Sequence, residues 1–319
     1  MTSADDEPLL SGLRVLDLGQ GIAGPYCAAI LQQQGAEVIK VEPPQGDWAR
    51  KMGLSKDGFS AVVLAYNAGK SGLCVDAATA AGQAVLARMA AQVDVVIQNF
   101  RAGVADRLNI GYAALSAANP RLVYASISGF GADGPLAQLP ATDNVMQAVG
   151  GLMWGNRDAA NQPRRVGVYL ADLATAMYAA QAISAALYRR ALSGQGRHIA
   201  LSLFEACCAL QASNLIDAVW SGGAPLPRAP SAPSGVFAVA DGYITVSTLD
   251  DAMFSRLCAA LDLPQCLADP RFASNASRLA NAAAINEIVA ARLAGEPLED
   301  CARRLRDADI LSAEVTDYE

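Results

Sequence analysis

Two aspartates in the 319-residue chain stand where helices are predicted to begin, and a carboxylate in such a place can do chemistry. Asp143 opens the segment DNVMQAVGGLM, and Asp172 opens a long apolar segment that ends near Arg190. As an N-cap, Asp143 would accept backbone N–H hydrogen bonds and face the positive end of its helix, which favours the ionised form. An ionised carboxylate can be a nucleophile. Each of the two aspartates could equally be only a helix cap.

A second candidate is the glycine-rich turn after the first apolar run, LRVLDLGQGIAG. Gly19, Gly21 and Gly24 have the spacing G-x-G-x-x-G, Pro25 begins a helical segment, and Glu42 follows the next apolar run. This order is typical of a dinucleotide-binding unit, in which backbone N–H groups bind pyrophosphate and an acid binds ribose. The alternative is a structural turn that needs glycine for its backbone conformation, and the spacing alone does not separate the two.

Metal and cysteine chemistry have little support in the sequence. The seven cysteines are scattered, no two of them form a C-x-x-C pair, and His198 is the single histidine. We therefore expect no metal site. No particular cysteine is indicated as a catalytic partner of His198.

The run of residues 12–50 resembles the opening of the class III CoA-transferases, the family that includes formyl-CoA and carnitine CoA-transferases and the 2-methylacyl-CoA racemases. The matching parts are AGP at a helix start, GAEVIKVEPP, and GDWAR. Further on, SISGFGADGP and the segment that begins at Asp143 match the family's patterns S-x-x-G-F-G-x-x-G-P and D-x-x-x-Q-A-x-x-G-L-M. The resemblance extends over nearly the whole chain. It explains the residues after Gly24, which the dinucleotide motif does not.

By this resemblance, Asp143 is expected to be the nucleophile of CoA transfer. Its carboxylate would attack an acyl-CoA thioester to give a mixed anhydride, and the CoA thiolate would convert this to an enzyme-bound thioester. An acceptor carboxylate would open the thioester to a second anhydride, and thiolate attack would release the new acyl-CoA. Backbone N–H groups of a glycine-rich turn are expected to hold the oxyanion. The expected partners are an acyl-CoA and a small carboxylic acid, with no permanently bound cofactor.

The resemblance leaves a second chemistry open, which is the epimerisation of a 2-methylacyl-CoA. In the racemase branch the acid that matches Asp172 is one of two bases, and a histidine precedes the first aspartate. Thr142 stands at that place here and His198 lies in another segment, so the racemase pair is absent. A dinucleotide-dependent oxidoreductase and a non-catalytic CoA-binding protein are the alternatives from other classes.

For CoA, the resemblance indicates a site at the glycine turn and at the asparagine–phenylalanine pair that follows a later strand. The residues carried over are Gln20, Ile22, Ala23, Lys70, Asn99, Phe100 and Arg107. N–H groups at a helix N-terminus bind phosphate, and lysine or arginine adds charge. Either basic residue could equally be a solvated surface charge. Members of the family form interlocked dimers, which implies a homodimer here.

The elements that must position these residues are apolar strands separated by helices. Strands are expected at residues 13–18, 38–41, 73–75, 93–97, 122–127 and 198–203, and helices at 26–34, 78–91, 172–190, 204–220 and from near 143. This alternation predicts an α/β fold with a Rossmann-like parallel sheet, helices on both faces, and ligands beyond the carboxyl ends of the strands. Residues 19–24, 99–107 and 128–135 all follow that edge.

Two domains are expected. Residues 1–220 would form a large CoA-binding α/β domain, the proline-rich residues 221–235 a linker, and residues 236–319 a smaller α+β domain. The smaller domain should contain a hairpin of residues 236–239 and 243–247, with helices at 251–261 and 276–305. In the family, a further C-terminal stretch returns to the large domain. Its absence here is expected to leave a sheet edge or a helix face uncovered.

Composition limits the partners. A net charge of −7 without a basic block means that nucleic acid is not expected to bind. Hydrophobic residues make up 53% of the chain and charged residues 17%, which is typical of a soluble α/β enzyme. No apolar run approaches the ~20 residues of a membrane span, and residues 1–8 lack the pattern of a signal peptide. We therefore expect a cytoplasmic protein with no membrane partner.

Overall fold

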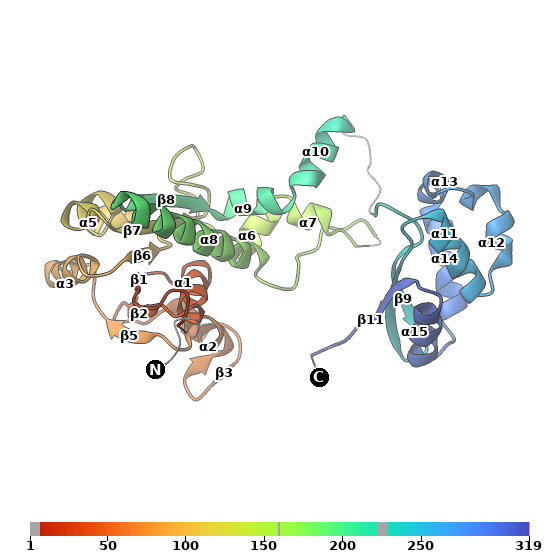
Figure 1. Ribbon diagram of the computed structural model, residues 1–319, viewed down its shortest axis with the longest axis horizontal. Coiled ribbons are helices and arrows are strands. Elements are labelled where there is room, and N and C mark those ends of the chain that lie inside the picture. Colours follow the sequence, from red (N-terminus) through yellow and green to blue (C-terminus); the bar gives the residue numbers. More distant parts are fainter. Residues whose placement is uncertain (1–6, 159, 223–228, 319) are drawn as a thin grey trace. The chain divides into compact units, whose positions relative to one another are not determined.

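The computed structural model describes residues 7–158, 160–222 and 229–318. The chain divides into two compact units, Met1–Ile216 and Asp217–Glu319, whose elements are labelled in Figure 1. Of the predicted linker at 221–235, residues 223–228 lie outside the described residues, and its last two residues already belong to a strand, β9 Ser234–Val239.

A six-stranded parallel sheet forms the centre of the first unit, in the order β5-β2-β1-β6-β7-β8. Its strands are β1 Arg14–Asp17, β2 Glu37–Glu42, β5 Ser71–Cys74, β6 Val95–Gln98, β7 Val123–Ser128 and β8 Arg197–Ser202. The predicted parallel α/β sheet is confirmed. The chain adds strands first on one side of β1 and then on the other, so the strand order reverses between β1 and β6. Such a switch point is where open α/β sheets bind ligands.

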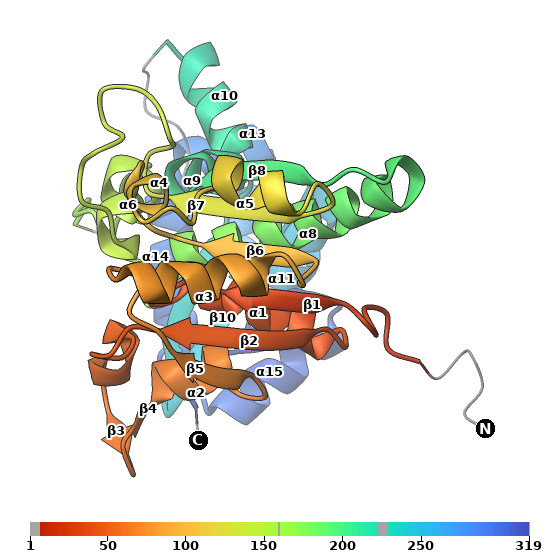
Figure 2. The ribbon, with the colours of Figure 1, turned by 90° about the vertical axis from the view of Figure 1, so that its left-hand side faces the viewer.

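Helices cover both faces of this sheet, because alternate residues of a strand point to opposite sides. On one face Val15 and Ile97 pack with α1, Ala23–Gln33, and α8, Leu170–Ser193. On the other face Leu16 and Val96 pack with α3, Ala80–Ala90, and α5, Tyr112–Ala118. Figure 2 shows α3 and α5 in front of the strands, with α1 and α8 behind them.

The long helix α8 is central to the first of these layers. By length and composition it could cross a membrane, which was not predicted, and half of its apolar stretch is buried within the structure. It packs against α1, against α9, Leu203–Leu210, and against the strands β7 and β8. This burial accounts for the apolar side chains on its inner side, such as Ile183 and Leu187, while Met177, Tyr188 and Leu192 are exposed.

The remaining elements up to Trp220 lie in the segments between the strands of the sheet and after its last strand. They are the 3-10 helix η2 Trp48–Lys51, the hairpin β3 Ser55–Lys56 and β4 Phe59–Ser60, α2 Ala61–Asn67, α4 Val104–Arg107, α6 Asp143–Val149, α7 Leu152–Gly155, α9 Leu203–Leu210 and α10 Ala212–Trp220. The single helix predicted over 204–220 is therefore two helices. The break is at Gln211, whose side-chain amide donates to the carbonyls of Gly150 at 2.7 Å and Cys207 at 3.0 Å.

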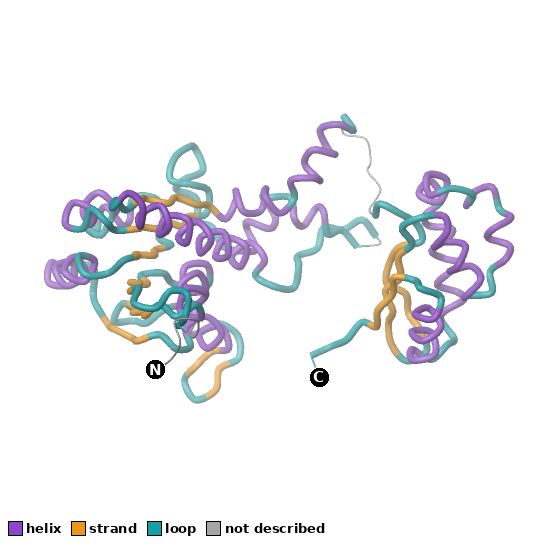
Figure 3. The backbone as a smooth tube through the Cα atoms, viewed as in Figure 1, coloured by secondary structure: helices purple, strands orange, loops and turns teal. Residues whose placement is uncertain are grey.

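The second unit contains a three-stranded antiparallel sheet in the order β11-β10-β9, packed with helices (Figure 3). Its elements are β9 Ser234–Val239, β10 Gly242–Ser247, α11 Asp251–Ala260, α12 Pro264–Ala268, η3 Pro270–Phe272, α13 Asn275–Ala280, α14 Ala282–Leu293, α15 Leu298–Asp307 and β11 Leu311–Glu314. The predicted hairpin is present. The helix predicted over 276–305 is three helices, since the chain turns at Asn281 and again before Pro297. β11 was not predicted.

Candidate active site

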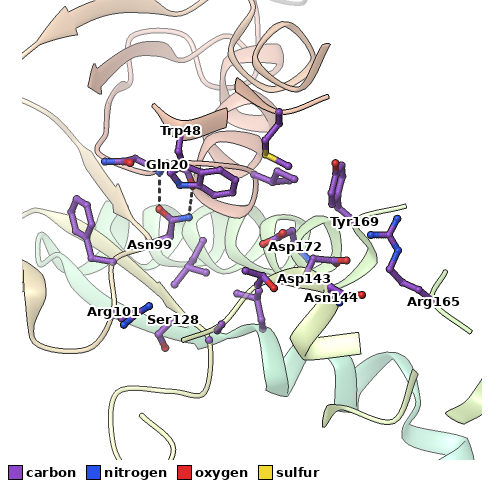
Figure 4. Close-up of a pocket in the computed structure, with 18 residues that line it drawn as sticks. Gln20, Trp48, Asn99, Arg101, Ser128, Asp143, Asn144, Arg165, Tyr169 and Asp172 are labelled. Atoms are coloured by element: carbon purple, nitrogen blue, oxygen red, sulfur yellow. Dashed lines mark hydrogen bonds between the residues drawn. The ribbon is translucent and has the colours of Figure 1, made fainter. Parts of the chain in front are cut away.

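A pocket of about 380 Å³ lies at the carboxyl ends of β1, β6 and β7 (Figure 4). Its walls come from the glycine turn after β1, the segments after β6 and β7, and the first turns of α6 and α8. Four of the seven residues predicted to bind CoA line it, which are Gln20, Ile22, Asn99 and Phe100, together with Asp143. The sheet edge thus gathers residues that are far apart in the sequence, as parallel strands do.

Asp143 lies at the first position of α6 and is only 4% exposed. The predicted N-cap role is wrong, because Thr142 is the N-cap and its hydroxyl accepts from the Val145 N–H. The Asp143 carboxylate is directed instead to other donors. Its Oδ1 accepts from the Ala171 N–H at 2.8 Å, in the first turn of α8, and its Oδ2 accepts from Gln147 Nε2 at 2.8 Å. A carboxylate without a proton can accept all of these bonds, since both of its oxygens are acceptors.

Asp172 lines the same pocket, and Figure 4 shows its side chain beside that of Asp143. It is the third residue of α8, whose N-cap is Tyr169, so the predicted N-cap role of Asp172 is also wrong. Its backbone N–H lies 3.5 Å from Asp143 Oδ1. Burial, followed by the negative charge of Asp143, raises the pKa of the Asp172 carboxyl to about 7.

Side chains of the protein occupy the N–H groups of the glycine turn. The Gly19 N–H donates to Asp17 at 2.9 Å, the Gln20 N–H to Asn99 Oδ1 at 2.8 Å, and the Gly21 N–H to Asp47 at 2.9 Å. Glu42, at the place of a ribose-binding acid, is bound by Arg50 at 2.7 and 2.8 Å. Three N–H groups of the turn and the acid that would bind ribose are thus engaged within the protein, which argues against the oxidoreductase alternative.

Four buried charges hold this turn, and we call them the buried charge cluster: Asp17, Lys40, Asp47 and Lys70. Lys40 Nζ lies 3.1 Å from Asp47 and also donates to the Gly19 carbonyl. Lys70 Nζ donates to Asp17 at 2.9 Å and to two further acceptors, one carbonyl and one amide oxygen. Burial lowers the pKa of Lys70, against the opposing effect of Asp17. All three ammonium protons of Lys70 have acceptors within the protein, and its contact with a CoA phosphate stays a prediction.

Three other residues singled out in the sequence lie off the pocket. Ala23 is buried at the start of α1, and Arg107 is exposed at the end of α4. Neither lines the pocket, and the CoA contacts proposed for them stay predictions. His198 is on the edge strand β8, where it hydrogen-bonds Ser126 Oγ at 2.9 Å and stacks on Tyr112.

Several residues that line the pocket were not predicted, notably Trp48, Arg101, Arg165 and Tyr169. Trp48 begins η2, whose N-cap is Asp47, and its ring packs over Gly21. A Cβ on Gly21 would lie 2.2 Å from the ring, and the φ of Gly21 is +77°. The tripeptide GDW in the family-like segment was the available signal for Trp48. Arg165 lies in a loop before α8 and had none.

The fold and the pocket define an α/β protein with a carboxylate-centred site at a switch point of a parallel sheet. The sequence pattern of CoA-transferase family III matches residues 10–319. The chain is 36% identical to the acetyl-CoA:oxalate CoA-transferase of Acetobacter aceti, over 93% of this chain and 78% of that one. It is 34% identical to the succinate–glutarate CoA-transferase of Agrobacterium fabrum, over 89% and 74%. A CaiB/BaiF family protein from Brucella suis has a similar structure, with a TM-score of 0.87 and 33% identity, over 98% of this chain and 85% of that one. The protein belongs to CoA-transferase family III.

Proposed function

We propose that this protein transfers CoA from an acyl-CoA to a small carboxylic acid, with Asp143 as the nucleophile. The observation that supports this proposal is the placement of the Asp143 carboxylate. It lines the pocket at the switch point, and its oxygens are held by the Ala171 N–H and the Gln147 amide. A carboxylate fixed by two neutral donors keeps its charge for attack and needs no reorganisation to react.

The proposed reaction needs no net proton transfer. Asp143 attacks the thioester carbonyl, the C–S bond breaks, and a mixed anhydride and the CoA thiolate result. The thiolate attacks the Asp143 carbonyl and expels the first carboxylate, which leaves an enzyme-bound thioester. The acceptor carboxylate then opens this thioester to a second anhydride. Thiolate attack on its acyl carbonyl gives the new acyl-CoA and regenerates Asp143.

For the acceptor we propose a short dicarboxylic acid. The relatives reported above are named for oxalate and for succinate and glutarate. Arg101 and Arg165 line the pocket, and a guanidinium can bind a carboxylate through two parallel hydrogen bonds. One carboxylate of such an acid would react at Asp143 while the other is bound by an arginine. CoA contacts at Gln20, Ile22, Asn99 and Phe100, a homodimer, and a cytoplasmic location complete the proposal.

Epimerisation of an acyl-CoA is the second candidate, because two carboxyl groups line one pocket. It would need Asp143 and Asp172 to exchange the α-proton of the substrate. The two candidates differ in a covalent step, since transfer acylates Asp143 and epimerisation does not.

The test is to trap the acylated aspartate. The protein is incubated with acetyl-CoA or succinyl-CoA and treated with hydroxylamine or borohydride, and the peptides are analysed by mass spectrometry. We expect a modification on Asp143 in the wild type and none in Asp143→Asn. We also expect the variant to lose transferase activity by at least about 10³-fold while CoA still raises its Tm.

Other outcomes contradict the proposal. Full transferase activity in Asp143→Asn would exclude Asp143 as the nucleophile. Exchange of the α-proton with deuterated water, without any adduct, would favour the epimerase. A rise in Tm with NAD and none with CoA would contradict both candidates.

A further inference from the structure

The transfer reaction written above uses one carboxylate, yet a second carboxyl group stands beside it. We call Asp143 and Asp172 the carboxyl pair. Both line the pocket, and the first turn of α8 links them, since Ala171 and Asp172 direct their N–H groups toward Asp143 Oδ1. Throughout the described ranges, neither carboxyl group forms an ion pair with a lysine or arginine. Two like charges placed so close cannot both be ionised without a large cost.

The surroundings of Asp172 decide which member carries the proton. The titratable groups that influence it or respond to it are Asp143 on α6, Tyr66 on α2 and Cys207 on α9. Burial raises the pKa of the Tyr66 hydroxyl, and that of the Cys207 thiol to about 11, so both stay neutral near pH 7. Arg165 lines the same pocket and brings a positive charge to its wall.

The hydrogen bonds of the pair are unequal. Asp143 accepts at both oxygens, from a backbone N–H and from the Gln147 amide. Tyr66, Tyr169 and Leu173, around Asp172, belong to a small cluster packed on Ile22 and its buried neighbours. Because both Asp143 oxygens already accept hydrogen bonds and burial raises the pKa of Asp172, we place the proton of the pair on Asp172.

We propose that Asp172 takes part in CoA transfer as a neutral carboxylic acid that donates a hydrogen bond to the carbonyl oxygen under attack at Asp143. This inference rests on the proposed function. When Asp143 adds to the thioester carbonyl, the oxygen becomes an oxyanion, and the Asp172 O–H stabilises it. When the C–S bond breaks, the carbonyl is restored and the proton has stayed on Asp172. Because Asp172 is neutral, it also does not repel the negatively charged thiolate and acceptor carboxylate when they enter the pocket.

This role predicts a direction for the pH dependence. With a pKa of about 7, Asp172 is protonated at lower pH and becomes a carboxylate as the pH rises. The donor is then lost and the pair carries two negative charges. We expect kcat/KM of the wild type to fall above pH 7, approaching tenfold for each pH unit.

The test compares Asp172→Asn with Asp172→Ala by measuring kcat and KM for succinyl-CoA between pH 5.5 and 9. Asparagine keeps an N–H donor and cannot ionise, so this variant should retain kcat within about tenfold of the wild type at pH 6 and have a flat profile to pH 9. Alanine removes the donor, and kcat should fall by about 10²-fold at every pH. The inference is wrong if Asp172→Asn keeps the alkaline fall, or if it is as slow as Asp172→Ala.

A measurement without substrate separates this inference from the proposed function. The pKa of Asp172 is raised above its ordinary value of 3.8, so between these two values the folded state binds more protons than the unfolded state. The contribution of Asp172 to the free energy of unfolding then falls as pH rises from about 4 to about 7, and levels off above. We therefore expect the Tm of Asp172→Asn, measured relative to the Tm of the wild type, to rise as the pH increases from about 4 to about 7. If the Tm difference appears while no adduct forms on Asp143, the protonation of Asp172 in the folded state is supported and the proposed function fails. If the adduct forms and the Tm difference is absent, the inference alone fails.

Discussion

Two groups of buried charges lie at the same edge of the parallel sheet, and their charges are arranged in opposite ways. In the buried charge cluster, each carboxylate has an ammonium partner, Lys70 for Asp17 and Lys40 for Asp47. The carboxyl pair of Asp143 and Asp172 has like groups side by side, with no ion-paired cation within the described part of the chain. Paired buried charges make a fold depend on every partner, whereas an unpaired carboxyl pair is poised for chemistry.

The buried charge cluster has a clear structural task. It fixes the glycine turn through Asp17 and Asp47, and Asp47 also caps η2 by accepting from the Ala49 N–H at 2.9 Å. This places Trp48 over Gly21 and into the pocket wall. The cluster therefore shapes the pocket without being part of its chemistry.

The largest effect on stability is expected where one partner of the cluster is removed. In Asp47→Ala, the ammonium of Lys40 loses its ion pair, and the N–H groups of Gly21 and Ala49 lose their acceptor. We expect the free energy of unfolding to fall by about 3–5 kcal/mol in urea titrations followed by circular dichroism. The matched change in the other group, Asp143→Ala, leaves two neutral donors without an acceptor but no unpaired cation, and should cost only about 1–3 kcal/mol. Equal losses in the two variants would remove the contrast between the groups.

Local patterns predicted the frame of the site well. The apolar runs before Gly19, Gln98 and Ser128 gave the strands whose ends meet at the pocket, and the family-like segment gave Asp143. The caps were missed by small offsets, because Thr142 and Asp143 are both good N-cap residues and only the position of α8 shows which one caps α6. The donor that binds Asp143 at the start of α8, the Ala171 N–H, is 28 residues away in the sequence.

Long-range partners explain what else was missed. The ion pair of Lys70 was not predicted, because its partner Asp17 is 53 residues away in the sequence. The Asn99 side chain forms two hydrogen bonds with the backbone of Gln20, which is 79 residues away in the sequence. Its role in holding the turn could therefore not be predicted from neighbouring residues. Arg165 enters the pocket from an irregular loop, where no periodic pattern gives the direction of a side chain. Sequence patterns identify elements, while tertiary packing assigns the partners of each charge.

A moderate effect on activity is expected at Arg165, which supplies positive charge to the pocket that holds the carboxyl pair. Arg165→Gln should raise the KM for a dicarboxylic acceptor such as succinate by about tenfold with kcat nearly unchanged, because a charged hydrogen bond to the acceptor is lost. The KM for a monocarboxylic acceptor should not change. The matched control is Arg164→Gln, since Arg164 is paired with Asp158 at 2.7 Å and does not line the pocket. Equal rises in KM for both classes of acceptor would show that Arg165 does not bind the second carboxylate.

The smallest effect is expected at His198, and it serves as the control for the carboxyl pair. A histidine has an ordinary pKa of about 6.5, so its titration could also cause a change in activity near pH 7. A variant without the single histidine is therefore the control for the fall in kcat/KM that we assign to Asp172. His198 is bound to Ser126 and its ring lies 4.9 Å from that of Tyr112, off the pocket. Burial lowers its pKa, against a weaker opposite effect of Asp106, so it is neutral at the pH where Asp172 loses its proton.

His198→Asn should therefore keep kcat/KM within about twofold of the wild type and retain the same fall in activity above pH 7. The Tm should drop by a few degrees, since about 1 kcal/mol of stacking is lost. A flat pH profile in His198→Asn would transfer the alkaline fall from Asp172 to the histidine. The titration of Asp172 would then be unsupported. The catalytic role that distinguishes the carboxyl pair from the buried charge cluster would be unsupported as well.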